Sequence, residues 1–329
     1  MIKIFLGSLV LAAALAPVNA DAAGRERRLS KRLLGVACDP DAVRAPEPSP
    51  EARRGMEAKL AEARAAYERR PEDPDAVIWL GRRTAYLGRF KEAIDIYTEG
   101  LKRHPRDARL YRHRGHRYIT ARCFDEAVRD LETAAKLVKD KPDEVEPDGI
   151  PNARNTPTST LNSNIYYHLG LAHYLNGDFE RALAAYRECM KFSKTDDMLV
   201  ATSHWLYMTL RRLNRPREAA QVLARIKDDL EIIENHEYAY LLKMYKGKVS
   251  PESLMKRVQR ERRDLVTVGY GVGNWYLYND QPRKALRTFL ETVERMQTTS
   301  FGHIAAEVEL RHAGLKDYPP VKLRTKTID

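Results

Sequence analysis

The stretch of sequence that decides the fold is residues 80–105, LGRRTAYLGRFKEAIDIYTEGLKRHP. It belongs to two segments, 76–88 and 91–103, in which apolar side chains recur at intervals of three and four residues. This spacing is typical of amphipathic helices. Pro105 follows the second segment and cannot continue a helix. The stretch therefore predicts two helices joined by a short turn.

The landmarks of this helix pair return at a fixed distance along the chain. Three pairs of residues are separated by 34 positions: Pro71 and Pro105, Gly81 and Gly115, and Ala93 and Ala127. A second helix pair is accordingly expected over 110–121 and 125–138. A period of this size indicates units that stack and share a continuous core. The sequence therefore predicts an array of helix pairs.

The first unit resembles the tetratricopeptide repeat. The residues that follow this family's helix-turn-helix pattern are Leu80, Gly81, Gly88, Phe90, Ala93, Tyr97 and Pro105. Small residues at 81 and 93 suit two helices that approach closely, and Tyr97 fills the space that this approach leaves. The resemblance implies an all-α, right-handed α-solenoid that acts as a noncatalytic protein-interaction scaffold.

The pattern can be followed over residues 52–314, which predicts about six helix pairs. The fourth unit keeps Ala219 but has Tyr207 in place of the packing glycine, and the fifth is a degenerate pair expected over 235–246 and 251–264. The predicted organisation is a signal peptide at 1–20, a basic, proline-rich flexible arm at 21–51, a capping helix with the first two repeats at 52–141, an acidic insert at 142–162, the third to sixth repeats at 163–299 with 233–265 degenerate, a capping helix at 300–314 and a tail at 315–329.

Residues 1–20 have the features of a secretory signal. Lys3 precedes an apolar run over 4–16, and Val18-Asn19-Ala20 offers small side chains at a cleavage site. The apolar run is too short to span a bilayer as a helix, which takes about 20 residues. We therefore expect an exported protein, periplasmic or secreted, without a transmembrane segment.

The chain has three cysteines, an odd number for a protein expected in an oxidising compartment. Cys189 falls at a small-residue packing position of a predicted helix, so we expect a buried thiol there. Cys38 and Cys123 are then the one pair open to a disulfide, although the sequence does not establish that they join. Gly35 stands where a lipoprotein signal requires leucine, which argues against lipidation of Cys38.

The acidic insert interrupts the repeat after the second unit. Ala127 and Ala182 lie 55 positions apart instead of 34. The insert, 142–162, contains four prolines and four acidic residues, so it cannot continue a helix. Two interpretations stay open: a surface loop, or a lid or self-docking strand over a basic face.

In a stacked array of this family, the first helix of each pair lines the concave face. The residues that we predict to bind a ligand there are Arg82, Tyr86, Arg109, Arg112, His113, His116, Asn164, Tyr167, His168, Tyr174, His204, Trp205, Arg211 and Asn274. Guanidinium groups bind carboxylates in a bidentate geometry, and aromatic rings supply rigid contact area. The expected ligand is an acidic or extended peptide, although the rings are equally expected to complete helix packing.

The net charge indicates which partners are favoured, and the absence of known motifs argues against an enzyme. The chain has 57 basic and 46 acidic residues and a formal net charge of +11, which favours anionic partners. The alternative function is therefore an envelope assembly factor that binds anionic cell-wall polymer or glycan through a basic face, whereas export argues against nucleic acid. Signatures such as G-x-S-x-G and H-E-x-x-H are absent. We therefore expect no catalysis and no cofactor. We also expect no metal, because the positive charge of the arginines around the predicted histidines opposes a divalent cation.

Overall fold

The computed structural model describes residues 38–261 and 263–313, and the predicted signal peptide and C-terminal tail lie outside these residues. The described part of the chain is all-α apart from one isolated bridge between Val145 and Thr160. Its helices are α2 (Pro50–Arg69), α3 (Pro74–Tyr86), α4 (Phe90–Arg103), α5 (Ala108–Thr120), α6 (Phe124–Val138), α7 (Leu161–Leu175), α8 (Phe179–Phe192), α9 (Asp196–Arg212), α10 (Pro216–Ala224), α11 (His236–Tyr245), α12 (Pro251–Arg260), α13 (Leu265–Leu277), α14 (Pro282–Val293) and α15 (Phe301–His312). None of these helices is both long enough and apolar enough to cross a membrane.

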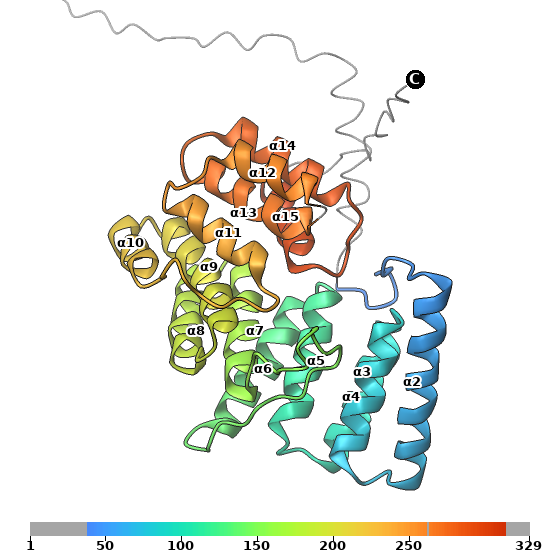
Figure 1. Cartoon of the computed structure of the whole chain (residues 1–329). Helices are drawn as coiled ribbons and strands as arrows, with labels where there is room; N and C mark the ends of the chain where they lie inside the picture. The colour runs from blue at the N-terminus through green and yellow to red at the C-terminus, as the bar shows by residue number, and fades with distance from the viewer. Residues whose placement is uncertain (1–37, 262, 314–329) are drawn as a thin grey trace, which may run out of the picture.

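Six helix pairs stack in one curved array (Figure 1). The pairs are α3–α4, α5–α6, α7–α8, α9–α10, α11–α12 and α13–α14, and each packs against the next. The helix α2 packs on α3 at the start of the array, and α15 packs on α13 and α14 at its end. The predicted α-solenoid is confirmed, and the degenerate fifth unit is a helix pair like the others.

Each pair turns through one residue with a left-handed backbone. These residues are Gly88, Arg122, Gly177, Asn214, Gly247 and Asp280, with φ between 54° and 77°. Glycine adopts this conformation without strain, and asparagine and aspartate tolerate it better than most side chains. The common turn shows that all six pairs share one local geometry. Arg122 departs from the residue preference, and its side chain has a buried partner on α15.

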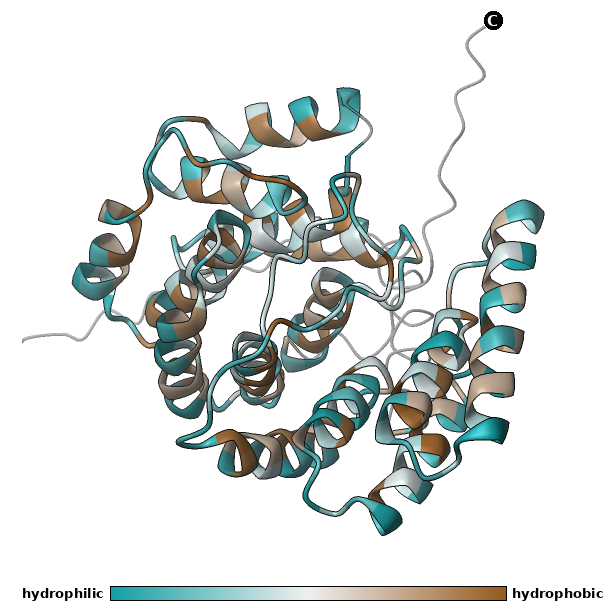
Figure 2. Ribbon diagram, turned by 60° about the horizontal axis from the view of Figure 1, so that its bottom comes forward, coloured by the Kyte–Doolittle hydropathy of each residue, from teal (hydrophilic) through white to brown (hydrophobic). Residues whose placement is uncertain are grey.

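Close helix approach within a pair depends on a small residue that meets a large one 16 positions later. The four such contacts are Gly81 with Tyr97, Gly115 with Leu131, Gly170 with Tyr186 and Gly273 with Phe289. A Cβ atom added at any of these glycines would overlap the facing side chain. Figure 2 shows apolar and polar residues interleaved along the helices, as expected when one side of each helix is buried. Burial of these large side chains stabilises each pair.

Some helix ends differ from the predicted ones because of capping residues. The helix α3 begins at Pro74, two residues earlier than expected, because the Asp73 carboxylate accepts a hydrogen bond from the backbone N–H of Asp75 at 2.9 Å. The helix α12 ends at Arg260, so its predicted extension to 264 is wrong. Asp264 instead caps α13, and its carboxylate accepts hydrogen bonds from the first turn of that helix.

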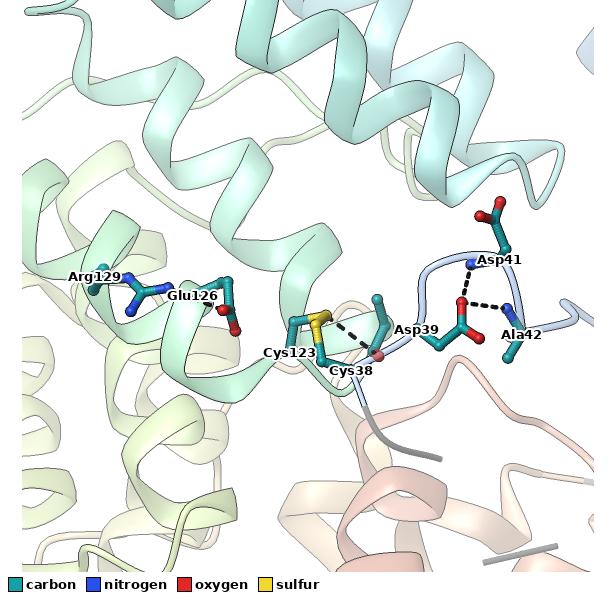
Figure 3. Close-up of a disulfide and its surroundings, with 8 residues drawn as sticks. Cys38, Asp39, Asp41, Ala42, Cys123, Glu126 and Arg129 are labelled. Carbon is teal, nitrogen blue, oxygen red and sulfur yellow. Dashed lines mark hydrogen bonds and ion pairs between the residues drawn. A yellow bond between two sulfur atoms is a disulfide. The ribbon is translucent and has the colours of Figure 1, made fainter. Parts of the chain in front are cut away.

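Cys38 and Cys123 form a disulfide (Figure 3). It holds residues 38–49, the last part of the predicted arm, to the turn that precedes α6. The same segment meets the other end of the array, because the carbonyl of Arg44 accepts a hydrogen bond from the Thr298 hydroxyl between α14 and α15. The arm segment therefore links the second repeat to the C-terminal end of the solenoid.

The C-terminal helix α15 also reaches back to earlier repeats. Its Glu307 carboxylate accepts a hydrogen bond from Arg122 at 2.7 Å, and its Glu309 pairs with Arg212 on α9. The ring of Phe301, in its first turn, has its centroid 5.5 Å from that of His116 on α5. The helix predicted as an end cap therefore also lies against the inner helices of the array.

Candidate functional site

The N-terminal half of the concave face is formed by α3, α5 and α7, the first helices of three successive pairs. Residues three or four apart share one side of a helix, so Arg109, Arg112, His113 and His116 share one side of α5. Arg109 is held by Asp107, whose carboxylate accepts its Nη2–H at 2.6 Å. Arg112 is buried and has a different partner, which comes from the insert.

Residues 143–149 of the insert, which we call the strap, lie against this half of the face. The Glu146 carboxylate is 3.0 Å from Nη2 of Arg112, and it accepts a hydrogen bond from Nδ2 of Asn164 at 3.2 Å. Both ionised side chains are less than a tenth exposed. Buried charges of this kind are tolerated only when they are paired and hydrogen-bonded. Of the two interpretations of the insert, the structure shows the second, because its acidic residue lies over a basic face.

The backbone of the strap is bound by α3. Nη1 of Arg82 donates to the carbonyl of Pro147, and Nη1 of Arg83 donates to the carbonyl of Gly149, each at 2.8 Å. Gly149 approaches the Tyr86 hydroxyl and the Arg82 guanidinium so closely that a side chain there would overlap both. The concave face therefore binds one carboxylate and two carbonyls of a segment that is not helical.

A groove of about 200 Å³ stays open between the strap, α3 and α5. Its lining includes Ile78, Trp79, Arg82, Arg109 and Val145. The indole of Trp79 has the guanidinium groups of Arg82 and Arg83 at 4.6 and 4.8 Å from its ring centroid. Stacked arginine and tryptophan provide contact area that is both rigid and cationic. The groove therefore suits an anionic or extended ligand beside the strap.

Three neutral histidines lie beside this cluster. Burial and the Arg112 guanidinium hold the pKa of His113 and the pKa of His168 well below the usual range. Burial and the Arg117 guanidinium do the same for the pKa of His116. The rings of His116 and His168 are in contact, with centroids 4.4 Å apart. Because these imidazoles are uncharged near neutral pH, the guanidinium groups set the charge of the site.

Arg117 belongs to this site, and the sequence prediction does not include it. It is partly exposed, and among the described residues no carboxylate pairs with it and no hydrogen bond involves its side chain. The groups with the strongest electrostatic effect on it, after burial, are Tyr97, Tyr86, Arg112 and Arg82. Arg117 follows His113 by four positions, so the helix period could have identified it.

The sequence prediction also omits the strap residue Glu146 and the strap's partner Arg83. The concentration of acidic residues in the insert is the available signal for Glu146. Helix periodicity carries no information on which acid of a nonhelical segment reaches which helix. The predicted residues that the structure brings together here are Arg82, Tyr86, Arg112, His113, His116, Asn164 and His168.

The remaining predicted residues lie mostly in the C-terminal half of the array, where α15 covers the inner helices. The most deeply buried of them are Tyr174, His204, Trp205 and Asn274, each no more than 3% exposed. Nδ2 of Asn274 donates to the Tyr174 hydroxyl at 2.7 Å, and the Trp205 ring stacks on Tyr270. These four side chains complete helix packing and have no free surface for a ligand.

Three further predicted residues also have partners inside the chain. The Tyr167 hydroxyl is 3.2 Å from the Tyr238 hydroxyl. Nη2 of Arg211 donates to the carbonyl of Tyr278 at 3.0 Å, while Arg109 is held by Asp107 as described above. Arg109 nevertheless lines the groove beside the strap and stays in the candidate site, which we restrict to the N-terminal half of the concave face.

A metal site would need ligand atoms that are close together and free. Within the described ranges, the group of His, Cys, Asp and Glu side chains that satisfies the distance requirement is Cys38, Cys123 and Glu126. The two sulfur atoms are joined in the disulfide, so they offer no thiolate to a metal ion.

Comparison with known proteins identifies the repeats. Family models of the tetratricopeptide repeat match residues 57–108, 80–144 and 163–196. The chain therefore contains tetratricopeptide repeats. These ranges include the first two helix pairs and the third, which carry the clearest copies of the sequence pattern.

Two curated relatives match part of the chain. BBSome complex member BBS4 of Bos taurus is 26% identical over 140 residues, which are 43% of this chain and 23% of that protein. The Mus musculus protein of the same name is 25% identical over 138 residues, 42% of this chain and 22% of its own. The match thus spans less than a quarter of the length of these relatives.

Solved structures also match the chain, at low sequence identity. One is YrrB, described as a TPR protein with an unusual peptide-binding site, with 16% identity, coverage of 77% of this chain and 97% of that chain, and a TM-score of 0.41. Another is MamA AMB-1, with 16% identity, coverage of 54% and 89%, and a TM-score of 0.39.

Proposed function

We propose that this chain is a noncatalytic interaction scaffold of the cell envelope that binds an acidic, extended peptide segment on the concave face. Tetratricopeptide-repeat proteins generally mediate protein–protein interaction, and the chain contains such repeats. Solenoids of this kind present an extended concave surface to their partners. The proposed site is the half of that surface formed by α3, α5 and α7.

The observation that carries the proposal is the position of the strap. An acidic, nonhelical segment already lies on the face, with Glu146 on Arg112 and the carbonyl of Pro147 on Arg82. Main-chain contacts bind an extended peptide of any sequence, and a carboxylate at a defined place adds selectivity. The groove beside Trp79 leaves room for further side chains of a ligand.

The proposed location in the envelope is supported by the disulfide. Disulfides form and persist in oxidising compartments and are rare in the cytosol. The cysteines of the Cys38–Cys123 pair are 85 positions apart and tie the arm to the second repeat. Together with the signal-like residues 1–20, this bond favours export.

Substitution of Trp79 tests the proposal without removing a hydrogen bond to the strap. A fluorescent acidic peptide would be titrated by anisotropy into the chain and into Trp79→Ala, with Trp275→Ala as control. Both tryptophans are partly exposed and lie on first helices, but Trp275 is on α13. We expect Trp79→Ala to weaken binding about tenfold or more, as loss of an aromatic anchor does. Equal affinities for the two variants would contradict the proposed site.

The second candidate function is binding of an anionic envelope polymer, favoured by the net charge of +11. Basic side chains are exposed well away from the groove, as at α12, where Arg257 stacks on Tyr240 at 4.3 Å. Binding that depends on many surface charges weakens steeply with salt, whereas a peptide held in a groove by a buried carboxylate and an indole weakens modestly. Affinities measured at low and high salt therefore separate the two functions.

A further inference from the structure

Resting on the proposed function, we propose that the strap is a built-in competitor of the partner. We infer that the partner's segment is an extended peptide with two carboxylates, one that replaces Glu146 on Arg112 and a second that reaches Arg117.

The charge of the site is only partly balanced by the strap. Three guanidinium groups, those of Arg82, Arg112 and Arg117, act on one another here, and the paired carboxylate is that of Glu146. Nε of Arg112 is buried without a hydrogen-bond partner. Arg82 and Arg117 are partly exposed and no carboxylate of the described residues pairs with them, so like charges are gathered beside Arg112, and an added anion lowers their repulsion. The site therefore has a place for a second carboxylate that the strap does not supply.

The strap is held by polar contacts and buries little apolar surface. Val145 is 62% exposed and Ile150, directly after the strap, is 68% exposed. The backbone of the strap forms one β-bridge among the described residues, between Val145 and Thr160. A segment with little buried apolar area opens at low cost relative to the helices around it. We therefore expect the strap to leave the face while α3 and α5 stay folded, with the first turn of α7 losing the bonds of Leu161 and Asn162 to the strap.

Attachment at both ends makes the strap an effective competitor. A tethered ligand has an effective concentration on the order of millimolar, which an incoming peptide must overcome. A peptide that only copies the strap has no advantage over it. An acid placed on Arg117 supplies that advantage, because charge-assisted hydrogen bonds are stronger than neutral ones. The partner is therefore expected to carry one more correctly placed acid than the strap does.

The first experiment loosens the strap and measures binding of its own sequence. The probe is a fluorescein-labelled peptide of residues 143–149, Asp-Glu-Val-Glu-Pro-Asp-Gly, titrated into the full chain, Glu146→Gln and Glu144→Gln. Glu144 is exposed in the same strap, so its substitution changes the net charge equally. We expect Glu146→Gln to bind the probe about tenfold tighter than the full chain and the Glu144→Gln control, from loss of a charged hydrogen bond in the competitor.

Gly149→Ala gives a second route to the same result. Its added methyl group would overlap Tyr86 and Arg82, so the strap and these two side chains cannot all keep their places, and the strap is loosened without any change of charge. Thermal melting followed by circular dichroism shows whether each variant is folded, and Gly149→Ala serves alone if Glu146→Gln is not. Probe affinity equal to that of the full chain in a folded, loosened variant would overturn the competitor role.

The second experiment locates the second carboxylate. Peptides with one added glutamate at each position of the probe are titrated into Glu146→Gln and into Glu146→Gln with Arg117→Gln. We expect one position to raise the affinity about tenfold, and this gain to disappear when Arg117 is replaced. A uniform gain at all positions, or a gain that survives Arg117→Gln, would overturn the assignment of Arg117.

The failures of this inference and of the proposed function are distinguishable. If acidic peptides bind in the Trp79 groove equally well with the strap bound or loosened, the competitor role is wrong and the proposed function stands. If no acidic peptide binds the full chain or either loosened variant, the proposed function is wrong as well.

Discussion

The carboxylate of Glu146 lies 3.0 Å from the guanidinium of Arg112, and both side chains are more than nine-tenths buried. The two residues come from different parts of the fold, one from a nonhelical insert and one from the first helix of the second repeat. Through this ion pair, the insert binds to the chain's own concave face instead of extending as a surface loop.

Replacement of Gly81 tests the repeat register. A leucine there would overlap the Tyr97 ring in the first pair, and we expect Gly81→Leu to lower the free energy of unfolding by roughly 1–3 kcal/mol. Gly55 on α2 has open space where a Cβ atom would lie, so Gly55→Ala should stabilise the helix by about 0.5–1 kcal/mol. Urea unfolding measures both, and an unchanged midpoint for Gly81→Leu would show that the register is wrong.

Removal of the Glu307 carboxylate tests the docking of α15. Its partner Arg122 is only 2% exposed, so Glu307→Ala leaves a buried charge unpaired and should cost about 3–5 kcal/mol. The control is Glu291→Ala, because that carboxylate is exposed and 3.9 Å from Arg287, and such surface pairs are worth less than about 1 kcal/mol. Similar melting temperatures for the two variants would mean that α15 is not held by this pair.

Reduction of the disulfide tests the attachment of the arm. Opening a loop of 85 positions is expected to cost roughly 2–4 kcal/mol, so the melting temperature should fall when a reductant is added. Cys38→Ser with Cys123→Ser should melt at the reduced temperature in both conditions. Cys189 is a buried thiol and does not contribute. A melting temperature unaffected by reductant would contradict the pairing.

Buried neutral histidines should make the chain labile in acid. Burial lowers the pKa of His204 from 6.5 to about 3, and the pKa values of His113, His116 and His168 are lowered as well. The histidines of the unfolded chain are protonated at a higher pH than those of the folded chain. Their contribution to the free energy of unfolding is therefore fully present above pH 6.5 and declines as the pH falls toward 3. In that pH range, each histidine lowers the free energy of unfolding by about 1.4 kcal/mol for each unit by which the pH falls.

Glu307 adds to this decline at the lowest pH. Although burial raises its pKa, hydrogen bonding to His303 and the charge of Arg122 lower the pKa from 4.5 to about 2. Its contribution is therefore present above pH 4.5 and is lost as the pH falls toward 2. Urea midpoints measured from pH 7.5 to pH 4 should decrease continuously below about pH 6.5. Midpoints that stay constant over this range would contradict neutral burial of the histidines.

The helix pairs can be predicted from the sequence because their determinants are local. The glycine at 81 has counterparts in the second, third and last pairs, each facing a large side chain 16 positions later, and every pair has a left-handed turn residue like Gly88. Even the fifth pair, which lacks the pattern, follows from the length that two units require. The predicted helix ends are wrong where a capping residue sets the end, as Asp264 does at the start of α13.

The candidate site is harder to predict because its contacts are long-range. Arg82 and Pro147 are 65 positions apart, and no periodicity relates them. The first helices carry cationic and aromatic side chains at the inner positions of the array. The sequence does not show, however, that α15 covers the inner positions near Trp205. The insert is recognisable as an acidic segment, whereas the choice of Glu146 over its neighbouring acids depends on where Arg82 and Arg83 hold the backbone.

Amide hydrogen exchange of the strap tests the central claim most directly. The full chain would be measured alone and with a saturating acidic peptide from the glutamate scan. If the peptide replaces the strap on Arg112, amides of residues 143–149, including the Glu146 N–H that donates to the Ser159 carbonyl at 3.3 Å, should exchange faster. Amides of α3 and α5 should stay protected. A bound peptide that leaves the exchange of residues 143–149 unchanged would contradict the claim that this face is the binding site and that the strap occupies it.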